Sequence, residues 1–236
     1  MKHAVEQEVG FLLHSRSFTD SRIILELFTR QHGKLKAVHR LPSRKRQATT
    51  KPQPFIPLVV HYSGTGELKN LSDLETLSAP ILGAGTSLFC GLYLNELLQK
   101  LLPIEFEYAG LFACYQRALL SLSQAVPGEE DIPLREFELQ LLAELGYGIN
   151  FSMDTLGEAI GCNSERFYRF DPADGFTPTA LNNDRRALIC SGAEIAMLGE
   201  GQWQQEETRR IAKRVCRLAV NMVLGGRELK SRELFL

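Results

Sequence analysis

The sequence contains one long stretch without acidic residues. No Asp or Glu occurs between Leu27 and Gly66, although the 236-residue chain is almost neutral, with a formal net charge of −1. A solvated surface normally mixes both signs of charge, so this acid-free window needs an explanation. The window contains eight basic residues, which are Arg30, Lys34, Lys36, Arg40, Arg44, Lys45, Arg46 and Lys51.

The sequence also lacks the short motifs of common catalytic sites. It has no G-x-x-x-x-G-K-[ST] phosphate loop, no G-x-S-x-G elbow and no G-x-G-x-x-G after a predicted strand. Its five histidines lie within the first 61 residues, and none forms H-x-x-x-H or stands beside paired cysteines. We therefore expect a binding protein and not an enzyme.

Paired cysteines and long apolar runs are missing as well. The five cysteines never occur at C-x-x-C spacing, so we expect free thiols in a reducing cytoplasm. The start of the chain has no apolar stretch behind its basic residue, which predicts no signal peptide. Residues 76–95 carry no charge, but their proline, glycines and hydroxyls make them too polar for a membrane span, and we expect a buried helix there.

The near-neutral total conceals two regions of opposite charge. Residues 1–70 contain 12 Lys and Arg against 5 Asp and Glu, whereas the remainder contains 15 against 23. The formal charges of the two parts are therefore +7 and −8. This asymmetry predicts two modules with different partners.

The first module, residues 1–78, has the alternation of a small antiparallel barrel. Ile23, Leu25 and Leu27 alternate with other residues in one segment, and Leu35 and Ala37 do so in the next. We expect about five short strands, within residues 9–15, 21–29, 33–38, 54–64 and 66–71. Five strands in this length suit an OB-fold, and an SH3-like barrel is the alternative.

The second module, residues 79–236, has helical periodicity. We expect helices within residues 87–102, 107–122, 132–151 and 204–224, and an irregular insertion with a short hairpin at about 151–186. Pro133 suits a first helical turn, and Gly146 and Gly225 suit helix ends. The predicted core stripes are Leu134, Phe137, Leu141 and Leu145 in one helix and Ile211, Val215, Leu218 and Met222 in another. The fold class is therefore α+β.

The acid-free window is typical of a nucleic-acid contact. Cations placed near phosphates release condensed counterions, which gives affinity without sequence preference. Phe55 and Tyr62 flank the window and are either base-stacking or core residues. The Arg-rich face of the last helix is ambiguous, because Glu206 and Glu207 precede it and can pair with it. The candidate nucleic-acid-binding residues are Lys34, Lys36, Arg40, Arg44, Lys45, Arg46 and Lys51.

Five segments in this order resemble the RecO family of bacterial recombination mediators: "LLHSRSFTDSRIILELFTRQHGKLKAV", "PQPFIPLVVHYSGTGELKNL", "CGLYLNELL", "FELQLLAELGYGINF" and "GGRELKSRELF". The resemblance implies an N-terminal OB-fold followed by a helical domain. It also implies binding of single- and double-stranded DNA, annealing of complementary strands, and loading of RecA together with RecR. The implied recruiter is the C-terminal tail of single-stranded DNA-binding protein (SSB). The alternative is a protein-docking adaptor whose basic loop is incidental.

The chain departs from the family pattern at two places. Many members carry four zinc cysteines in the segment that corresponds to residues 150–186, where this chain has only Cys162, with Cys190 just beyond. A tetrahedral site needs four ligands, so we expect no metal and no other cofactor. A Lys-Gly-x-Arg pattern common after the third strand is replaced by His39-Arg40-Leu41-Pro42, which keeps the charge but loses the glycine.

The implied SSB tail is an acidic peptide that ends in a hydrophobic residue with a free carboxylate. Such a ligand needs an apolar pocket with a cation at its rim. Arg135 stands in an acidic neighbourhood beside Leu134 and Phe137, and we expect it on a different helix face from them, where it meets the tail. The competing interpretation is a local ion pair with Asp131 or Glu138.

Overall fold

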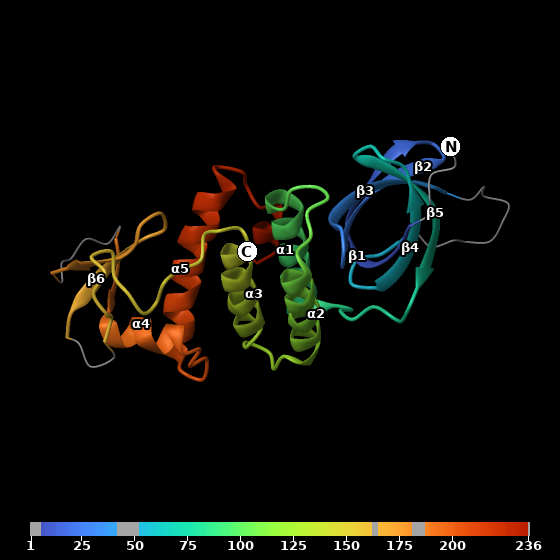
Figure 1. Cartoon of the computed structure of the whole chain (residues 1–236). Helices are drawn as coiled ribbons and strands as arrows, with labels where there is room; N and C mark the ends of the chain where they lie inside the picture. The colour runs from blue at the N-terminus through green and yellow to red at the C-terminus, as the bar shows by residue number, and fades with distance from the viewer. Residues whose placement is uncertain (1–5, 42–51, 162–164, 181–186, 236) are drawn as a thin grey trace. The chain divides into compact units, whose positions relative to one another are not determined.

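The computed structural model describes residues 6–41, 52–161, 165–180 and 187–235 (Figure 1). The chain forms two compact units. Unit 1 comprises Met1–Pro127 together with Leu229–Leu236, and unit 2 comprises Gly128–Glu228. The expected boundary between residues 78 and 79 divides the sequence differently, because two helices after it belong to the same compact unit as the barrel. It stays a prediction.

Five strands in unit 1 close into a barrel, in the order β1-β2-β3-β5-β4. All neighbouring pairs are antiparallel except β3 and β5, which are parallel over residues 36–38 and 68–70. The closed barrel followed by helices confirms the expected OB-like α+β architecture. The strands are β1 (Glu6–Thr19), β2 (Arg22–Thr29), β3 (Gly33–Arg40), β4 (Pro57–Ser63) and β5 (Leu68–Thr76).

The alternation in the sequence fills the barrel interior. Side chains two residues apart in a strand point to the same face, so one set of each strand faces inward. The predicted inward residues of β2 and β3 are all buried there, with partners from the other strands. The interior cluster contains Leu12, Ile23, Leu25, Leu27, Leu35, Ala37, Leu58, Val60, Tyr62 and Leu71.

Two helices, α1 (Gly85–Leu101) and α2 (Ala109–Gln124), complete the packing of unit 1. Aromatic rings on the outside of the barrel pack on α2, with ring centroids 5.3 Å apart for Phe28 and Phe112. The buried Asn95 of α1 donates to the carbonyl oxygen of Leu12 at 3.1 Å, and its own side-chain oxygen accepts from the Tyr115 hydroxyl. This polar bridge satisfies the backbone next to an irregularity in β1 between Leu12 and His14.

The last residues of the chain also belong to unit 1. A 3-10 helix, η1 (Lys230–Phe235), lies against α1. The Glu96 carboxylate accepts hydrogen bonds from the Ser231 amide at 2.8 Å, the Ser231 hydroxyl at 2.6 Å and the Lys230 amide at 3.0 Å. One carboxylate therefore anchors the first turn of η1.

The described residues of unit 2 form three helices and a three-stranded sheet of order β7-β6-β8. The expected hairpin is present as β6 and β7, whereas β8 and α4 are not among the predicted elements. A capping box at Ser191 and Glu194 starts α4 and was the available signal. The elements are α3 (Asp131–Glu144), β6 (Phe167–Asp171), β7 (Gly175–Thr179), β8 (Leu188–Ser191), α4 (Gly192–Gly199) and α5 (Glu206–Leu224).

The buried face of α5 differs in part from the predicted stripe. Ile211 and Val215 are buried as expected, but Leu218 is 38% exposed. Small residues lie on the buried side instead, including Ala212 and Ala219, because they let α5 pack closely on its neighbours. As predicted, α5 ends at a left-handed glycine, Gly225, with φ of 57°.

Aromatic residues hold the small sheet together. The rings of Phe170 and Phe176 lie 5.0 Å apart, and Tyr168 is buried beside them. Cys190 is buried, and Cys162 falls outside the described residues. In the described parts of the chain no group of three or more His, Cys, Asp or Glu is placed to hold a metal ion. Residues 150–190 contain only Cys162 and Cys190, so they do not fit a four-cysteine zinc site.

Among the described residues, no helix is both long enough and apolar enough to span a membrane.

Candidate nucleic-acid interface

The hairpin formed by β1 and β2 carries an exposed polar tip. Every residue from His14 to Arg22 is exposed, whereas the residues before and after this run are buried. The register shifts between Ser17 and Thr19, so Phe18 lies at an irregular point of the strand, and 52% of its surface is exposed. The tip therefore presents an aromatic ring to solvent.

Cations surround this tip on the outer face of the barrel. Arg22 and Arg40 are direct register partners on β2 and β3, and Arg16 on β1 is the partner of Ile24 on β2. Because Ile23 faces the interior, Arg22 and its cross-strand partner Arg40 face outward. None of the three arginines has an ion-pair partner among the described residues. We call Arg16, Phe18, Arg22 and Arg40 the hairpin-tip surface.

The opposition of Arg22 and Arg40 has an energetic cost. Like charges directly opposite each other in a sheet are destabilising. The end of β3 is nevertheless fixed beside the hairpin turn, since the Leu41 amide donates to the Ser21 carbonyl oxygen at 2.8 Å. The fold thus holds the two arginines together, and an anion bound between them would relieve the repulsion.

Four predicted DNA-binding residues lie outside the described residues: Arg44, Lys45, Arg46 and Lys51. Along the chain, Arg44 follows Leu41, the last described residue of this region, by three positions. Their role stays a prediction.

Two other predicted residues are placed less favourably for phosphate contact. Lys34 is only 7% exposed, and its Nζ donates to the Gln99 carbonyl oxygen at 2.8 Å. We therefore correct the expectation that Lys34 faces a phosphate, because its ammonium group is engaged by α1. Lys36 is half-buried and is the register partner of Glu26, so its charge is partly offset.

The two aromatic candidates of the acid-free window are core residues. Phe55 is 1% exposed and Tyr62 is 2% exposed, so neither can stack on a base. The exposed ring is Phe18, which is not among the predicted site residues, and neither are Arg16 and Arg22. The available signal was a polar turn with cations on both sides, but Asp20 and Glu26 place this segment outside the acid-free window.

His39 contributes no charge to this surface at neutral pH. Burial lowers the pKa of His39, and the carboxylate of Asp73 opposes the shift only in part. The positive charge beside the hairpin tip therefore comes from arginine.

Arg135 is not at an exposed rim. It is buried on α3 with Leu134 and Phe137, and it forms an ion pair with the fully buried Glu138. The expectation of a separate, exposed helix face for Arg135 is therefore wrong. The competing interpretation, a local pair with Glu138, is what the structure contains.

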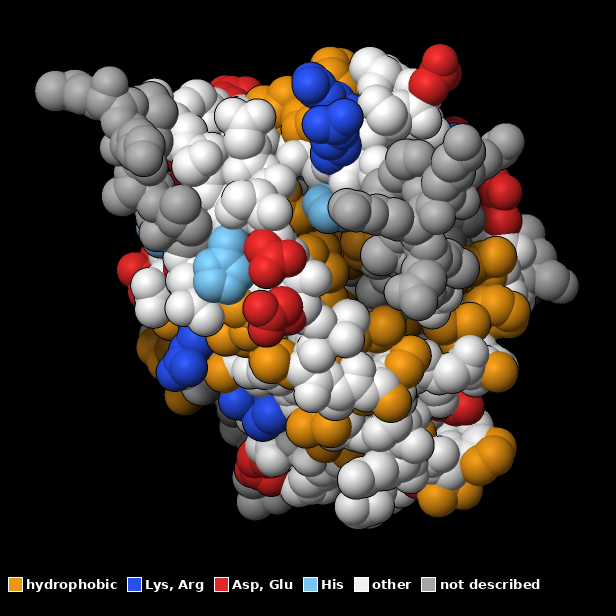
Figure 2. All heavy atoms as spheres, turned by 90° about the vertical axis from the view of Figure 1, so that its right-hand side faces the viewer, with side chains coloured by type: hydrophobic (Ala, Val, Ile, Leu, Met, Phe, Trp, Pro, Cys, Tyr) orange, Lys and Arg blue, Asp and Glu red, His pale blue; other side chains and the backbone are white. Residues whose placement is uncertain are grey.

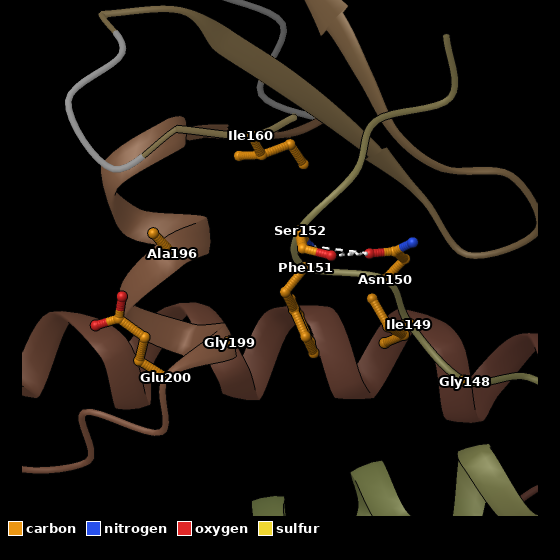
Figure 3. Close-up of a pocket in the computed structure, with 9 residues that line it drawn as sticks. All are labelled: Gly148, Ile149, Asn150, Phe151, Ser152, Ile160, Ala196, Gly199 and Glu200. Carbon is orange, nitrogen blue, oxygen red and sulfur yellow. Dashed lines mark hydrogen bonds between the residues drawn. The ribbon is translucent and has the colours of Figure 1, made fainter. Parts of the chain in front are cut away.

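Unit 2 also has an open hollow of about 670 Å³ (Figure 3). The Asn150 side chain faces Ser152 and accepts hydrogen bonds from its amide and hydroxyl, each at 2.9 Å. Among the described residues that line the hollow, Glu200 alone is charged, so this lining does not suit a polyanion. The lining residues are Gly148, Ile149, Asn150, Phe151, Ser152, Ile160, Ala196, Gly199 and Glu200.

The barrel face on the right-hand side of Figure 1 carries Lys and Arg in a few separate groups, with acidic, His and hydrophobic side chains between them (Figure 2). In OB-folds, oligonucleotides bind on strands 2 and 3 and on the loops that follow strands 1 and 4. The hairpin-tip surface occupies the first loop and the adjoining ends of β2 and β3. The fold and this surface define an OB-fold protein with three exposed arginines at the usual ligand position.

The comparison with known proteins identifies the family. Residues 1–80 match the family model "Recombination protein O N terminal", and residues 83–233 match "Recombination protein O C terminal". The chain belongs to the RecO family. It is 38% identical to the DNA repair protein RecO of Sodalis glossinidius (strain morsitans) over 228 residues, which cover 96% of this chain and 85% of that relative. It is 35% identical to the DNA repair protein RecO of Escherichia coli (strain K12), with 96% and 92% covered.

Proposed function

We propose that the chain is a non-catalytic mediator of DNA repair by recombination in the bacterial cytoplasm, where it associates with the nucleoid. It binds single- and double-stranded DNA, anneals complementary strands and, with RecR, helps load RecA onto SSB-coated DNA. One observation carries the DNA-binding step: Arg22 and Arg40 lie opposite each other, exposed and without an ion-pair partner among the described residues, beside the exposed ring of Phe18. The family relationship supports the remaining steps.

Annealing by such a protein requires no bond chemistry. Two strands repel each other through their phosphates, and cations that neutralise one strand reduce this repulsion. Arginines contact phosphates and an aromatic ring stacks on a base of any sequence, so the hairpin-tip surface suits sequence-independent binding. Bases that are not stacked stay free to pair.

The hairpin-tip surface is tested by the salt dependence of single-stranded DNA binding. Replacing Arg16, Arg22 and Arg40 by alanine removes about three phosphate contacts, so the slope of log K against log salt should become shallower by about 2. Fluorescence anisotropy with a labelled oligonucleotide measures this slope. The variant Arg44→Ala, Lys45→Ala, Arg46→Ala tests the neighbouring segment, and we expect a change of similar size.

Arg30→Ala is the matched control for these variants. Arg30 is also exposed and belongs to the acid-free window, but it follows the opposite end of β2 from Arg22. We expect it to leave the slope unchanged. Equal slopes in the wild type and in both triple variants would contradict the proposed site. Retention of partner proteins without any DNA binding by the wild type would favour the adaptor alternative.

We also propose that unit 2 binds the acidic SSB tail. A tail carboxylate can pair with Arg135 only if Glu138 moves away, because the two side chains already neutralise each other. Binding of a labelled tail peptide to the wild type and to Arg135→Ala measures this contribution, with folding of the variant checked by circular dichroism.

A further inference from the structure

The exposed face of α5 carries a row of cations in an acidic unit. Unit 2 has 17 Asp and Glu against 11 Lys and Arg. No acid occurs between Thr208 and Gly226, yet this stretch holds five cations, four of them exposed. We call these four the α5 stripe, and they are Arg210, Lys213, Arg214 and Arg217.

Helix geometry places the stripe on one side of α5. Residues three and four apart are neighbours on a helix surface, and the stripe has spacings of three, four and seven from its first member. Ile211, Val215 and Cys216 lie on the buried side. With a rise of 1.5 Å per residue, Arg210 and Arg217 are about 10 Å apart along the axis. The stripe is therefore a straight track of two helical turns.

Local acids neutralise only the first member of the stripe. Arg210 forms a two-bond ion pair with Glu207. Lys213, Arg214 and Arg217 have no ion-pair or hydrogen-bond partner among the described residues, and no acid lies three or four positions from any of them. The local pairing that the sequence left open thus accounts for one cation and leaves three.

The stripe does not serve the stability of α5. Like charges three or four residues apart weaken a helix, and the stripe contains four such pairs. Cations stabilise the last turn of a helix through its dipole, but the last turn of α5 has none. The net negative charge of unit 2 already favours solubility. The three unpaired cations therefore have the character of a binding surface.

We propose that the α5 stripe binds a second single strand of DNA through its phosphates. This inference rests on the proposed annealing function, in which the hairpin-tip surface holds the first strand. The stripe has no aromatic member, so it contacts backbone and not bases, and the bases of the second strand stay free to pair. The competing ligand is an acidic peptide, and the outcomes of the test distinguish it from DNA.

The test measures capture of a second strand by protein already bound to a first. A tethered oligo-dT is saturated with the full-length protein, and a labelled oligo-dT, which cannot pair with the first, is added at increasing salt. In Arg214→Ala, Arg217→Ala we expect first-strand binding to be unchanged and the salt slope of second-strand capture to become shallower by about 1.4.

Two control variants sharpen this result. Arg166→Ala, Arg169→Ala removes the same charge from exposed positions of the same unit, and we expect normal second-strand capture. Arg214→Lys, Arg217→Lys keeps the charge, and we expect it to restore most of the capture. The melting temperature of the alanine variant should be equal to or above that of the wild type, because like-charge repulsion is removed.

Other outcomes separate this inference from the proposed function. Loss of first-strand binding in the stripe variant would overturn a separate second site. Unchanged second-strand capture in the stripe variant would also overturn the inference. A variant that loses only the binding of an Asp/Glu-rich peptide would do the same. Both outcomes would leave the role of the hairpin-tip surface intact. Absence of any first-strand binding by the wild type would instead contradict the proposed function itself.

Discussion

Two buried charged residues of unit 2, Arg135 and Glu138, depend on each other. The Arg135 side chain is 9% exposed and that of Glu138 is fully buried. A buried charge without its partner is costly, whereas a pair of well-packed apolar residues in the same place often is not. Next to this pair, burial raises the pKa of the Cys216 thiol well above its usual value, and the Glu138 carboxylate adds to the shift. This thiol is therefore kept neutral inside the helix packing.

We predict that Arg135→Ala destabilises unit 2 by about 3–5 kcal/mol, because it leaves Glu138 buried without a counter-charge. Urea unfolding followed by circular dichroism measures the loss. The double variant Arg135→Met, Glu138→Leu removes both charges and should recover most of the stability. A single variant as stable as the wild type would show that Arg135 is free for another role, such as binding the SSB tail.

At the scale of elements, η1 depends on one carboxylate of α1. Burial acts to raise the pKa of Glu96, but hydrogen bonds from the Ser231 hydroxyl, the Ser231 and Lys230 amides and the charge of Lys100 outweigh it, so the pKa lies below the usual value of 4.5. A carboxyl group with a lowered pKa in the folded state stabilises the protein above its unfolded pKa. That contribution is lost as the pH falls through the folded pKa.

We predict that Glu96→Gln lowers the stability of unit 1 at pH 7 by about 1–2 kcal/mol, since charged acceptors form the stronger hydrogen bonds. The difference from the wild type should shrink as the pH falls below 4.5. Urea unfolding at pH 7 and pH 3.5 measures both values. Glu75→Gln, at an exposed position of β5, is the control and should change neither. A difference that is independent of pH would mean that the Glu96 charge is not what anchors η1.

Aromatic rings pack on the sheet of β6, β7 and β8, and residues 150–190 contain only two cysteines, Cys162 and Cys190. We predict that elemental analysis finds no stoichiometric zinc and that a chelator leaves the melting temperature unchanged. In contrast, Phe176→Ala should lower the stability by about 3–5 kcal/mol, because Phe176 is buried against Phe151 and Phe170. One zinc ion per chain, removed together with stability by the chelator, would contradict this account.

For the whole molecule, sequence patterns predict the helices and strands better than the long-range contacts of individual side chains. Alternation in β2 and β3 identified the barrel interior, and glycines marked the ends of α3 and α5. The sequence predicts an exposed Lys34, but its ammonium group donates to the carbonyl oxygen of Gln99, 65 residues away. No local pattern indicates such a contact. Arg135 was misplaced for a related reason: its ion pair with Glu138 is local, but the burial of that pair depends on packing by distant segments.

The candidate site was predictable only in part. The acid-free window places the predicted site within residues 27–66. Arg16 and Arg22 lie outside this window, and strand pairing brings them to the same surface as Arg40. Pairing of strands places residues from opposite ends of a hairpin side by side, and no local charge pattern reports that. The charge asymmetry predicted from the sequence corresponds to the two compact units: unit 1 has 16 basic against 11 acidic residues, and unit 2 has the opposite excess.

The return of residues 229–236 to unit 1 sets the order in which the protein can be completed during translation. Because synthesis starts at the N-terminus, the barrel, α1 and α2 emerge early, and unit 2 emerges next. The Glu96 carboxylate meets its three donors only after residues 230 and 231 have been synthesised and have left the ribosome. A chain that is truncated within unit 2 therefore has a first unit without η1.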